Sequence, residues 1–183
     1  MSGNLTMLFT KYPISRGMVV YAILWPSSDL FRQAATNGIQ KDKTTSTDFM
    51  RLTRFSLFGT LWVAPTVFTW VKISSRLIPG SSLRVAAFKA LLEQFTYGPF
   101  SIVTFYFGMN LLEGKSSKDA WQEVQNKFLP TWKMGVKFWP IVQTLNFALV
   151  PEKNRVVFVG LASFVWTTYL SFMEISPSKC KKV

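Results

Sequence analysis

Two sets of polar and small side chains at helical spacing are the residues best placed to do chemistry. Neighbouring members of each set stand three or four positions apart, so each set occupies one face of a helix. The sets are Lys89, Glu93, Tyr97, Ser101, Thr104 and Gly108, and then Gly160, Ser163, Thr167, Ser171 and Glu174. Both sets run into apolar stretches, where polar groups are costly and their placement is therefore informative.

These two sets have a functional and a structural interpretation. The functional one is a hydrated path for small solutes, lined by Lys89, Glu93, Ser101, Thr104, Ser163, Thr167 and Ser171. In the structural one, serine and threonine hydroxyls bond back to carbonyls one turn earlier, and amides tie helices together. Gln143 and Asn146 are such amides, and both can reach carbonyls left free by Pro140. The sequence leaves the two interpretations open.

Glu93 is the residue of the first set for which we expect a functional position. It precedes the uncharged run Phe95 to Leu112, so its carboxylate should point into a bundle near one membrane surface. An unpaired carboxylate there would be costly, and we therefore expect a cation partner from another segment. Candidates that border an apolar segment are Arg51, Arg54 and Arg155. The alternative is a solvated charge at a helix end, which contributes almost nothing to stability.

Missing residue types exclude much catalytic chemistry. The chain has no histidine and one cysteine, Cys180, so imidazole bases, His-ligated metals and thiolate clusters are unavailable. We therefore expect no catalytic residues, no metal, no cofactor and no enzymatic activity. The net charge of +12 is spread over the connecting segments rather than gathered on one face, which argues against nucleic acid. Anionic membrane lipids, cardiolipin among them, explain this charge more simply.

The apolar stretches predict the elements that position these residues. About 20 helical residues cross the hydrocarbon core of a membrane. Five stretches approach that length, the first being the weakest candidate because it contains Arg16 and Asp29: 13–31, 55–71, 95–112, 138–150 and 156–173. We therefore predict an all-α, polytopic membrane bundle of four to five transmembrane helices in a single domain, residues 1–183.

The connecting segments predict further features. Ser116 and Ser117 should begin an amphipathic helix that ends near Phe128 and lies on the membrane surface. The turn 151–154 makes the last two apolar stretches an antiparallel hairpin, and 37–47 is predicted to be a polar connector. The sequence has no glycine-xxx-glycine pair, so glycine-mediated packing is not predicted. Interfacial belts are the expected location of Trp25, Trp70, Trp132 and Trp139.

The stretch WPIVQTLNFALVPEKNR, residues 139–155, carries a family resemblance. It resembles the signature of the family of the twenty-two-kilodalton peroxisomal membrane protein, which includes the Mpv-seventeen mitochondrial proteins. Weaker landmarks extend the resemblance to about 12–171, and FYFGMNLLEGKS looks most like the Mpv-seventeen-like branch. Residues to which the motif assigns a structural role are Trp139, Pro140, Gln143, Asn146, Phe147, Pro151, Arg155 and Trp166.

This resemblance implies an integral protein of the mitochondrial inner membrane or, alternatively, of the peroxisomal membrane. Family members are associated with weakly selective passage of small solutes and with reactive-oxygen metabolism. The leading hypothesis is therefore a pore or channel for small solutes, formed by one chain or by a homo-oligomer. The alternative is a non-conducting structural or assembly subunit of a larger inner-membrane complex.

Overall fold

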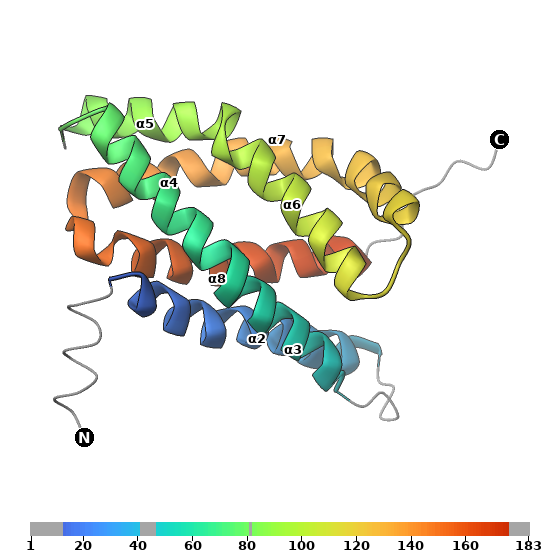
Figure 1. Ribbon diagram of the computed structural model, residues 1–183. Helices are drawn as coiled ribbons and strands as arrows, with labels where there is room; N and C mark the ends of the chain where they lie inside the picture. Colours follow the sequence, from blue (N-terminus) through green and yellow to red (C-terminus); the bar gives the residue numbers. More distant parts are fainter. Residues whose placement is uncertain (1–12, 41–46, 81, 176–183) are drawn as a thin grey trace, which may run out of the picture.

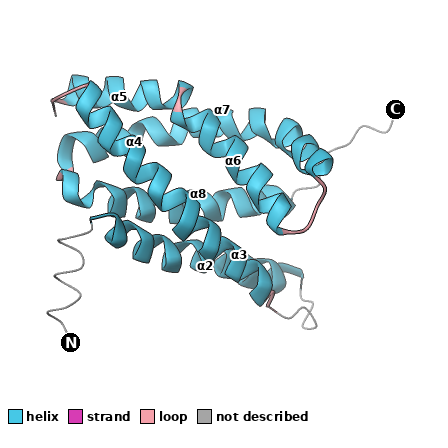
Figure 2. Ribbon diagram, viewed as in Figure 1, coloured by secondary structure: helices cyan, strands magenta, loops and turns pink. Residues whose placement is uncertain are grey.

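The computed structural model describes residues 13–40, 47–80 and 82–175, with side chains within 14–35, 47–80 and 82–169. All regular structure in these residues is helical, which confirms the all-α fold class (Figure 2). The elements are α2 (Pro13–Gln40), α3 (Phe49–Phe58), the π-helix η1 (Gly59–Val63), α4 (Ala64–Leu77), α5 (Leu83–Phe95), α6 (Tyr97–Leu112), α7 (Ser117–Leu149), the 3-10 helix η2 (Glu152–Asn154) and α8 (Arg155–Ile175).

The helices form two packed groups that α4 crosses (Figure 1). In one group α5 and α6 follow each other along α7, and in the other α2 lies along α8. The last two are parallel, because Gly17 of α2 meets Val156 and Val20 meets Gly160. The predicted hairpin is confirmed: α7 turns through η2 into α8. Part of the expected connector 37–47 is helical, since α2 continues to Gln40.

The second predicted apolar stretch lies in a long helix with one irregular turn. Asp48 caps its start by accepting a hydrogen bond from the Arg51 amide, and α3, η1 and α4 then follow without a gap. Pro65 has no N–H, so it cannot complete the helical ladder with the preceding turn. The wide π-helical turn stands immediately before this proline, as such turns often do where the ladder is interrupted.

The first polar set is divided between two helices. The backbone of Thr96 leaves helical geometry, with φ −118° and ψ −84°, and separates α5 from α6. Ser82 caps the start of α5, as its hydroxyl accepts a hydrogen bond from the Val85 amide. The break means that helical spacing alone does not place Lys89 and Glu93 on the same face as Ser101.

The amphipathic helix predicted to end near Phe128 is not a separate element. Ser116 does cap a helix start, but α7 continues for 33 residues and includes both the amphipathic stretch and the fourth apolar stretch. Pro130 and Pro140 lie inside it without ending it. Val124 is buried against Ile102 and Tyr106 of α6, whereas Trp121 is 50% exposed, and the location of this stretch on the membrane surface stays a prediction.

Glycine-mediated packing is present, contrary to expectation. A Cβ atom on Gly59 would lie 2.8 Å from Trp25 Cγ, and one on Gly108 would lie 2.6 Å from Phe58 Cε2. Each glycine accepts an aromatic ring from another helix rather than a second glycine. Trp25 also contacts the rings of Phe55, Phe58 and Phe105, which makes it the centre of the main aromatic core.

Within the described residues, none of the helices has both the length and the apolar character required to cross a membrane. The predicted number of transmembrane helices is therefore not confirmed.

Candidate functional site

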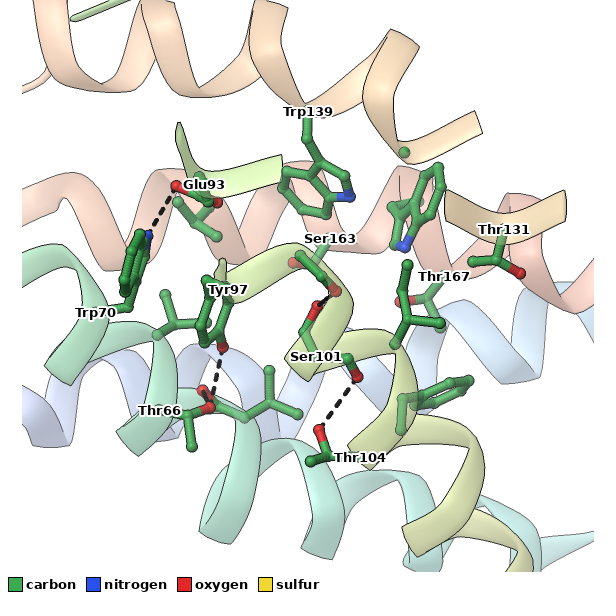
Figure 3. Close-up of a pocket in the computed structure, with 18 of the residues that line it drawn as sticks. Thr66, Trp70, Glu93, Tyr97, Ser101, Thr104, Thr131, Trp139, Ser163 and Thr167 are labelled. Atoms are coloured by element: carbon green, nitrogen blue, oxygen red, sulfur yellow. Dashed lines mark hydrogen bonds between the residues drawn. The ribbon is translucent and has the colours of Figure 1, made fainter. Parts of the chain in front are cut away.

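The predicted polar sets come together at an interior cavity of about 100 Å³ (Figure 3). Apart from the tryptophans, its polar lining consists of Thr66, Glu93, Gln94, Tyr97, Ser101, Thr104, Tyr106, Thr131, Gln143, Ser163 and Thr167. Glu93, Ser101, Thr104, Ser163 and Thr167 are candidate residues from α5, α6 and α8, so the two sets do meet. That they line a path for solutes stays a prediction.

Side chains rather than close backbone contact join α4 to α5 and α6 at this cavity. The hydroxyls of Thr66 and Tyr97 lie 3.0 Å apart, and the rings of Trp70 and Tyr97 stack at 5.7 Å. Figure 3 shows both pairs reaching across the space between the helices. The cavity lies beside this bridge because large side chains hold the backbones apart.

Glu93 is buried at the cavity wall and is held by two neutral donors. Only 4% of the Glu93 surface is exposed. The indole nitrogen of Trp70 donates to Oε2 at 3.0 Å, and the Gln143 amide donates to Oε1 at 2.5 Å. Helices α4 and α7 thus orient a carboxyl group that α5 carries.

The predicted cation partner of Glu93 is absent from the described part of the chain. Arg51 pairs with Asp29 and Glu113 instead, and Arg155 binds backbone carbonyls and a serine. The alternative of a solvated helix-end charge is also wrong, because Glu93 is buried. Sequence position predicted that the side chain enters the bundle, but not which groups surround it.

Two amides extend the Glu93 contact into the core. Asn146 Nδ2 donates to Gln143 Oε1 at 2.9 Å, and both residues are buried. They do not bind the carbonyls near Pro140 that we expected. Asn146 Oδ1 has no hydrogen-bond partner among the described atoms. Both amides therefore direct their donor groups toward the carboxylate.

The cavity hydroxyls are partly used within their own helices. Ser101 Oγ donates to Gly98 O at 2.8 Å, and Thr104 Oγ1 donates to Phe100 O at 2.9 Å. Other hydroxyls link helices, as Tyr106 to Thr131 does at 2.9 Å. The geometry thus contains both features considered from the sequence, a common cavity and local structural bonds.

Two of the seven candidate lining residues are not placed at the cavity. Lys89 is buried, but its ammonium donates to Gly80 O at 2.9 Å and lies over the Phe147 ring. It caps a turn at one end of the bundle. The side chain of Ser171 lies outside the described residues.

Comparison with known proteins supports the resemblance seen in the sequence. The model of the Mpv17 / PMP22 family matches residues 110–171. The chain is 32% identical to the Mpv17-like protein of Xenopus laevis over 91% of this chain and 79% of that relative. It is 30% identical to the Mpv17-like protein of Bos taurus over 93% and 82%, respectively.

The chain belongs to the Mpv17 / PMP22 family. A further relative is the mitochondrial inner membrane protein Mpv17 of Caenorhabditis elegans, 24% identical over 90% of this chain and 88% of that protein. The chain is accordingly a membrane protein of the Mpv17-like branch, located in the mitochondrial inner membrane, with the peroxisomal membrane as the alternative. No solved structure matches it.

A second buried cluster of this Mpv17 / PMP22 chain is formed around Phe147, which lies in the part that the family model matches. The Lys89 ammonium and the Arg155 guanidinium both contact the Phe147 ring, at 5.2 Å and 5.3 Å from its centroid. Arg155 also donates to the carbonyls of Phe147 and Val150, which lie at the end of α7. Cations near the end of a helix satisfy its last carbonyls. Arg155 thereby fixes the hairpin turn after Pro151.

The tryptophans of the cavity wall are the main feature that sequence reasoning missed. Trp25, Trp70, Trp132 and Trp139, all assigned to interfacial belts, line the cavity together with Trp62 and Trp166. Their positions in the sequence share no spacing, because they come from several helices. Only the packing of those helices brings the indoles together.

A second cavity, of about 410 Å³, lies at one end of the bundle. Its charged lining residues are Arg16, Lys72, Glu152 and Lys153, from α2, α4 and η2. Three cationic side chains and one anionic side chain give the lining of this cavity a net positive charge. The described lining of the cavity around Glu93 contains no lysine or arginine.

Proposed function

We propose that this protein is a weakly selective, non-enzymatic pore for small solutes in the mitochondrial inner membrane. A role in organelle homeostasis and reactive-oxygen metabolism follows from the family resemblance. The observation that carries the proposal is the meeting of polar residues from α4, α5, α6, α7 and α8 around one interior cavity. Polar groups gathered inside an otherwise apolar bundle are typical of solute pathways in membrane proteins.

The outer surface supports insertion of the bundle into lipid. Large apolar side chains are exposed on every α-helix, for example Ile23 at 60%, Phe95 at 68%, Ile141 at 66% and Leu161 at 55%. Contiguous exposed apolar surface marks a membrane or protein contact. We propose that α3–η1–α4 and the consecutive α5–α6 each act as one composite crossing, alongside α2, α7 and α8.

The described conformation corresponds to a closed pore. A cavity of about 100 Å³ is smaller than the engineered cavity of about 150 Å³ that binds benzene, so it admits only very small solutes. Conduction therefore requires the helices to separate. The π-helical turn η1, the break at Thr96 and the prolines within α7 are the positions where the helical ladder is already interrupted.

Conductance of the purified chain in planar bilayers tests the proposal. We expect stepwise conductance that the double substitution Ser101→Leu and Thr104→Leu abolishes or reduces at least tenfold, because two leucines fill the cavity. The matched control is Thr53→Leu with Thr168→Leu. These two hydroxyls also bond back to carbonyls of their own helices, but they do not line the cavity. Absence of conductance from the parent protein, or an equal loss of conductance in both double variants, would contradict the pore.

A second candidate is a non-conducting subunit of a larger inner-membrane complex. The local bonds of the cavity hydroxyls and the small cavity volume favour it, since both are compatible with a sealed interior. This function predicts no conductance from the isolated chain and migration in a larger complex on native gels. The pore predicts conductance from the chain alone or from its homo-oligomer.

Anionic lipids, cardiolipin among them, are the proposed partners of the basic end cavity. Arg16, Lys72 and Lys153 line a space whose wall also contains apolar side chains, namely Phe68, Val71, Val156 and Val157. Lys72→Gln with Lys153→Gln should weaken binding to cardiolipin-containing vesicles relative to neutral ones. The control is Lys133→Gln with Lys137→Gln, which removes two exposed lysines elsewhere.

A further inference from the structure

The wall of the central cavity has an unusual composition of aromatic rings and charge. Six of the chain's seven tryptophans line it. Glu93 is the one acidic residue among the described lining residues, and that lining contains no lysine or arginine. One acidic side chain and six indoles thus line the same cavity, together with the rings of Tyr97, Phe105 and Tyr106.

This combination matches the chemistry of organic cations. The face of an indole ring carries partial negative charge and attracts ammonium groups, and aromatic cages bind methylated ammonium ligands in this way. A carboxylate adds an opposite charge, and a cation bound beside it favours its ionised form. We propose that the cavity is a binding site for a small organic ammonium cation, with Glu93 as its counter-charge and the tryptophans as its cage.

The contacts of Glu93 leave room for such a ligand. Each carboxylate oxygen accepts one hydrogen bond, from Trp70 or from Gln143. Two carboxylate oxygens offer about four acceptor positions, so capacity remains for an ammonium N–H. Trp70 and Gln143 fix the orientation of the carboxylate without neutralising its charge. A bound ammonium supplies the cation partner that the described part of the protein does not.

Other ligand classes fit the cavity less well. Trp25 Nε1 is a buried donor without a partner in the wall and could bind an anion, but the charge of Glu93 would repel that anion. A hard metal ion needs several oxygen ligands, usually with more than one carboxylate. The described residues contain no cluster of acidic or other metal-binding side chains.

The size of the cavity restricts the ligand to a few heavy atoms. An engineered protein cavity of about 150 Å³ binds benzene, and this one is about 100 Å³. Trp62 lines the cavity and is also 43% exposed, which places the outer edge of the cavity between η1 and α6. Binding at this site does not depend on conduction, so it can be tested without a bilayer.

Intrinsic tryptophan fluorescence of the full chain in detergent is a direct readout, because six of seven indoles line the site. Three probes of similar size are titrated at constant ionic strength: ethylammonium, acetamide and acetate. We expect a saturable fluorescence change with ethylammonium, and at least tenfold weaker responses with the neutral and anionic probes. No saturable change, or an equal response to acetate, would overturn the proposal.

Glu93→Gln removes the charge while preserving the shape of the side chain. The new amide can donate to Gln143 Oε1 if the side-chain amides of Gln143 and Asn146 both flip, so that oxygen and nitrogen exchange positions. Asn146 Oδ1 then accepts a hydrogen bond from Gln143. The number of unpaired polar groups therefore does not rise. We expect ethylammonium affinity to fall at least tenfold. The matched control Glu123→Gln removes a carboxylate that pairs with Lys127 outside the cavity, and should bind as the parent does.

A second variant keeps the test decisive if Glu93→Gln lowers stability. Trp139→Leu removes one indole of the cage but no charge, and should weaken ethylammonium binding about threefold to tenfold. The thermal unfolding midpoint of each variant is measured alongside. Unchanged ethylammonium affinity in a folded Glu93→Gln or Trp139→Leu protein would show that the site does not act as an ammonium cage.

Discussion

Two buried carboxylates, Asp29 and Glu93, are held in opposite ways. Asp29 is fully buried and accepts hydrogen bonds from Arg32 at 2.8 Å, Arg51 at 3.1 Å and Gln33 at 2.8 Å. Glu93 is nearly as buried but has only the neutral donors Trp70 and Gln143 among the described residues. The first group is neutralised by arginines of the protein, whereas the second lines a cavity and has no cation partner among the described residues.

This difference distinguishes a structural ion-pair cluster, around Asp29, from a site that can still bind a ligand, around Glu93. The Asp29 cluster joins α2 to α3, and Arg51 extends it to Glu113 at the end of α6. Gln33 adds two bonds to the backbone of Asp48, at the start of α3. All of the groups that bind the Asp29 carboxylate are therefore residues of the protein itself. Burial of a carboxylate is thus a weak indicator of function, whereas burial beside a cavity without a cation is a stronger one.

Removal of Asp29 should have the largest effect on stability. Asp29→Ala leaves two partly buried guanidinium groups without their shared carboxylate, and loss of one partner of a buried ion pair costs about 3–5 kcal/mol. We expect the free energy of unfolding in detergent to fall by about 3 kcal/mol, measured by chemical denaturation. A change below about 0.5 kcal/mol would show that the cluster does not fasten the helices. Ethylammonium affinity of the remaining folded protein should not change.

Glu93→Leu should have an intermediate effect on stability. It leaves the donors of Trp70 and Gln143 unpaired in the interior, and each unpaired group costs about 1–3 kcal/mol. Removal of a buried charge offsets part of that cost, so we expect a net loss of about 2 kcal/mol. Glu93→Gln should lose less than about 1 kcal/mol while altering the ion preference of any conductance. A Glu93→Gln protein that matches the parent in both stability and ion preference would show that the charge of Glu93 has neither a structural nor a functional role.

Asn146→Leu should have the smallest effect of the three. Asn146 is fully buried, but it donates one bond, to Gln143, and its oxygen is already unpaired among the described atoms. Helix-linking hydrogen bonds in a membrane protein average about 0.6 kcal/mol, and we expect a loss of about 1 kcal/mol. The yield of folded protein should therefore decrease more than solute selectivity changes. Normal yield with altered permeability, measured in proteoliposomes, would assign Asn146 to the solute path instead.

Several features of this fold follow from local sequence alone. Long apolar stretches without charge predict helices, and Ser116 predicts a helix start, because a serine hydroxyl can bind a free amide in the first turn. The turn before Arg155 predicts the hairpin. Residues three and four positions apart share a helix face, so spacing alone groups Ser101 with Thr104 and Ser163 with Thr167.

Only the tertiary structure decided what those faces meet. Spacing within one helix contains no information about the distance to another helix. It therefore could not predict that Trp70 and Gln143 donate hydrogen bonds to Glu93, or that Arg51 pairs with Asp29. It also could not gather six tryptophans around one cavity, since these residues come from α2, η1, α4, α7 and α8. Interior chemistry in this protein depends on contacts between helices, and those contacts are set by the packing of the whole bundle.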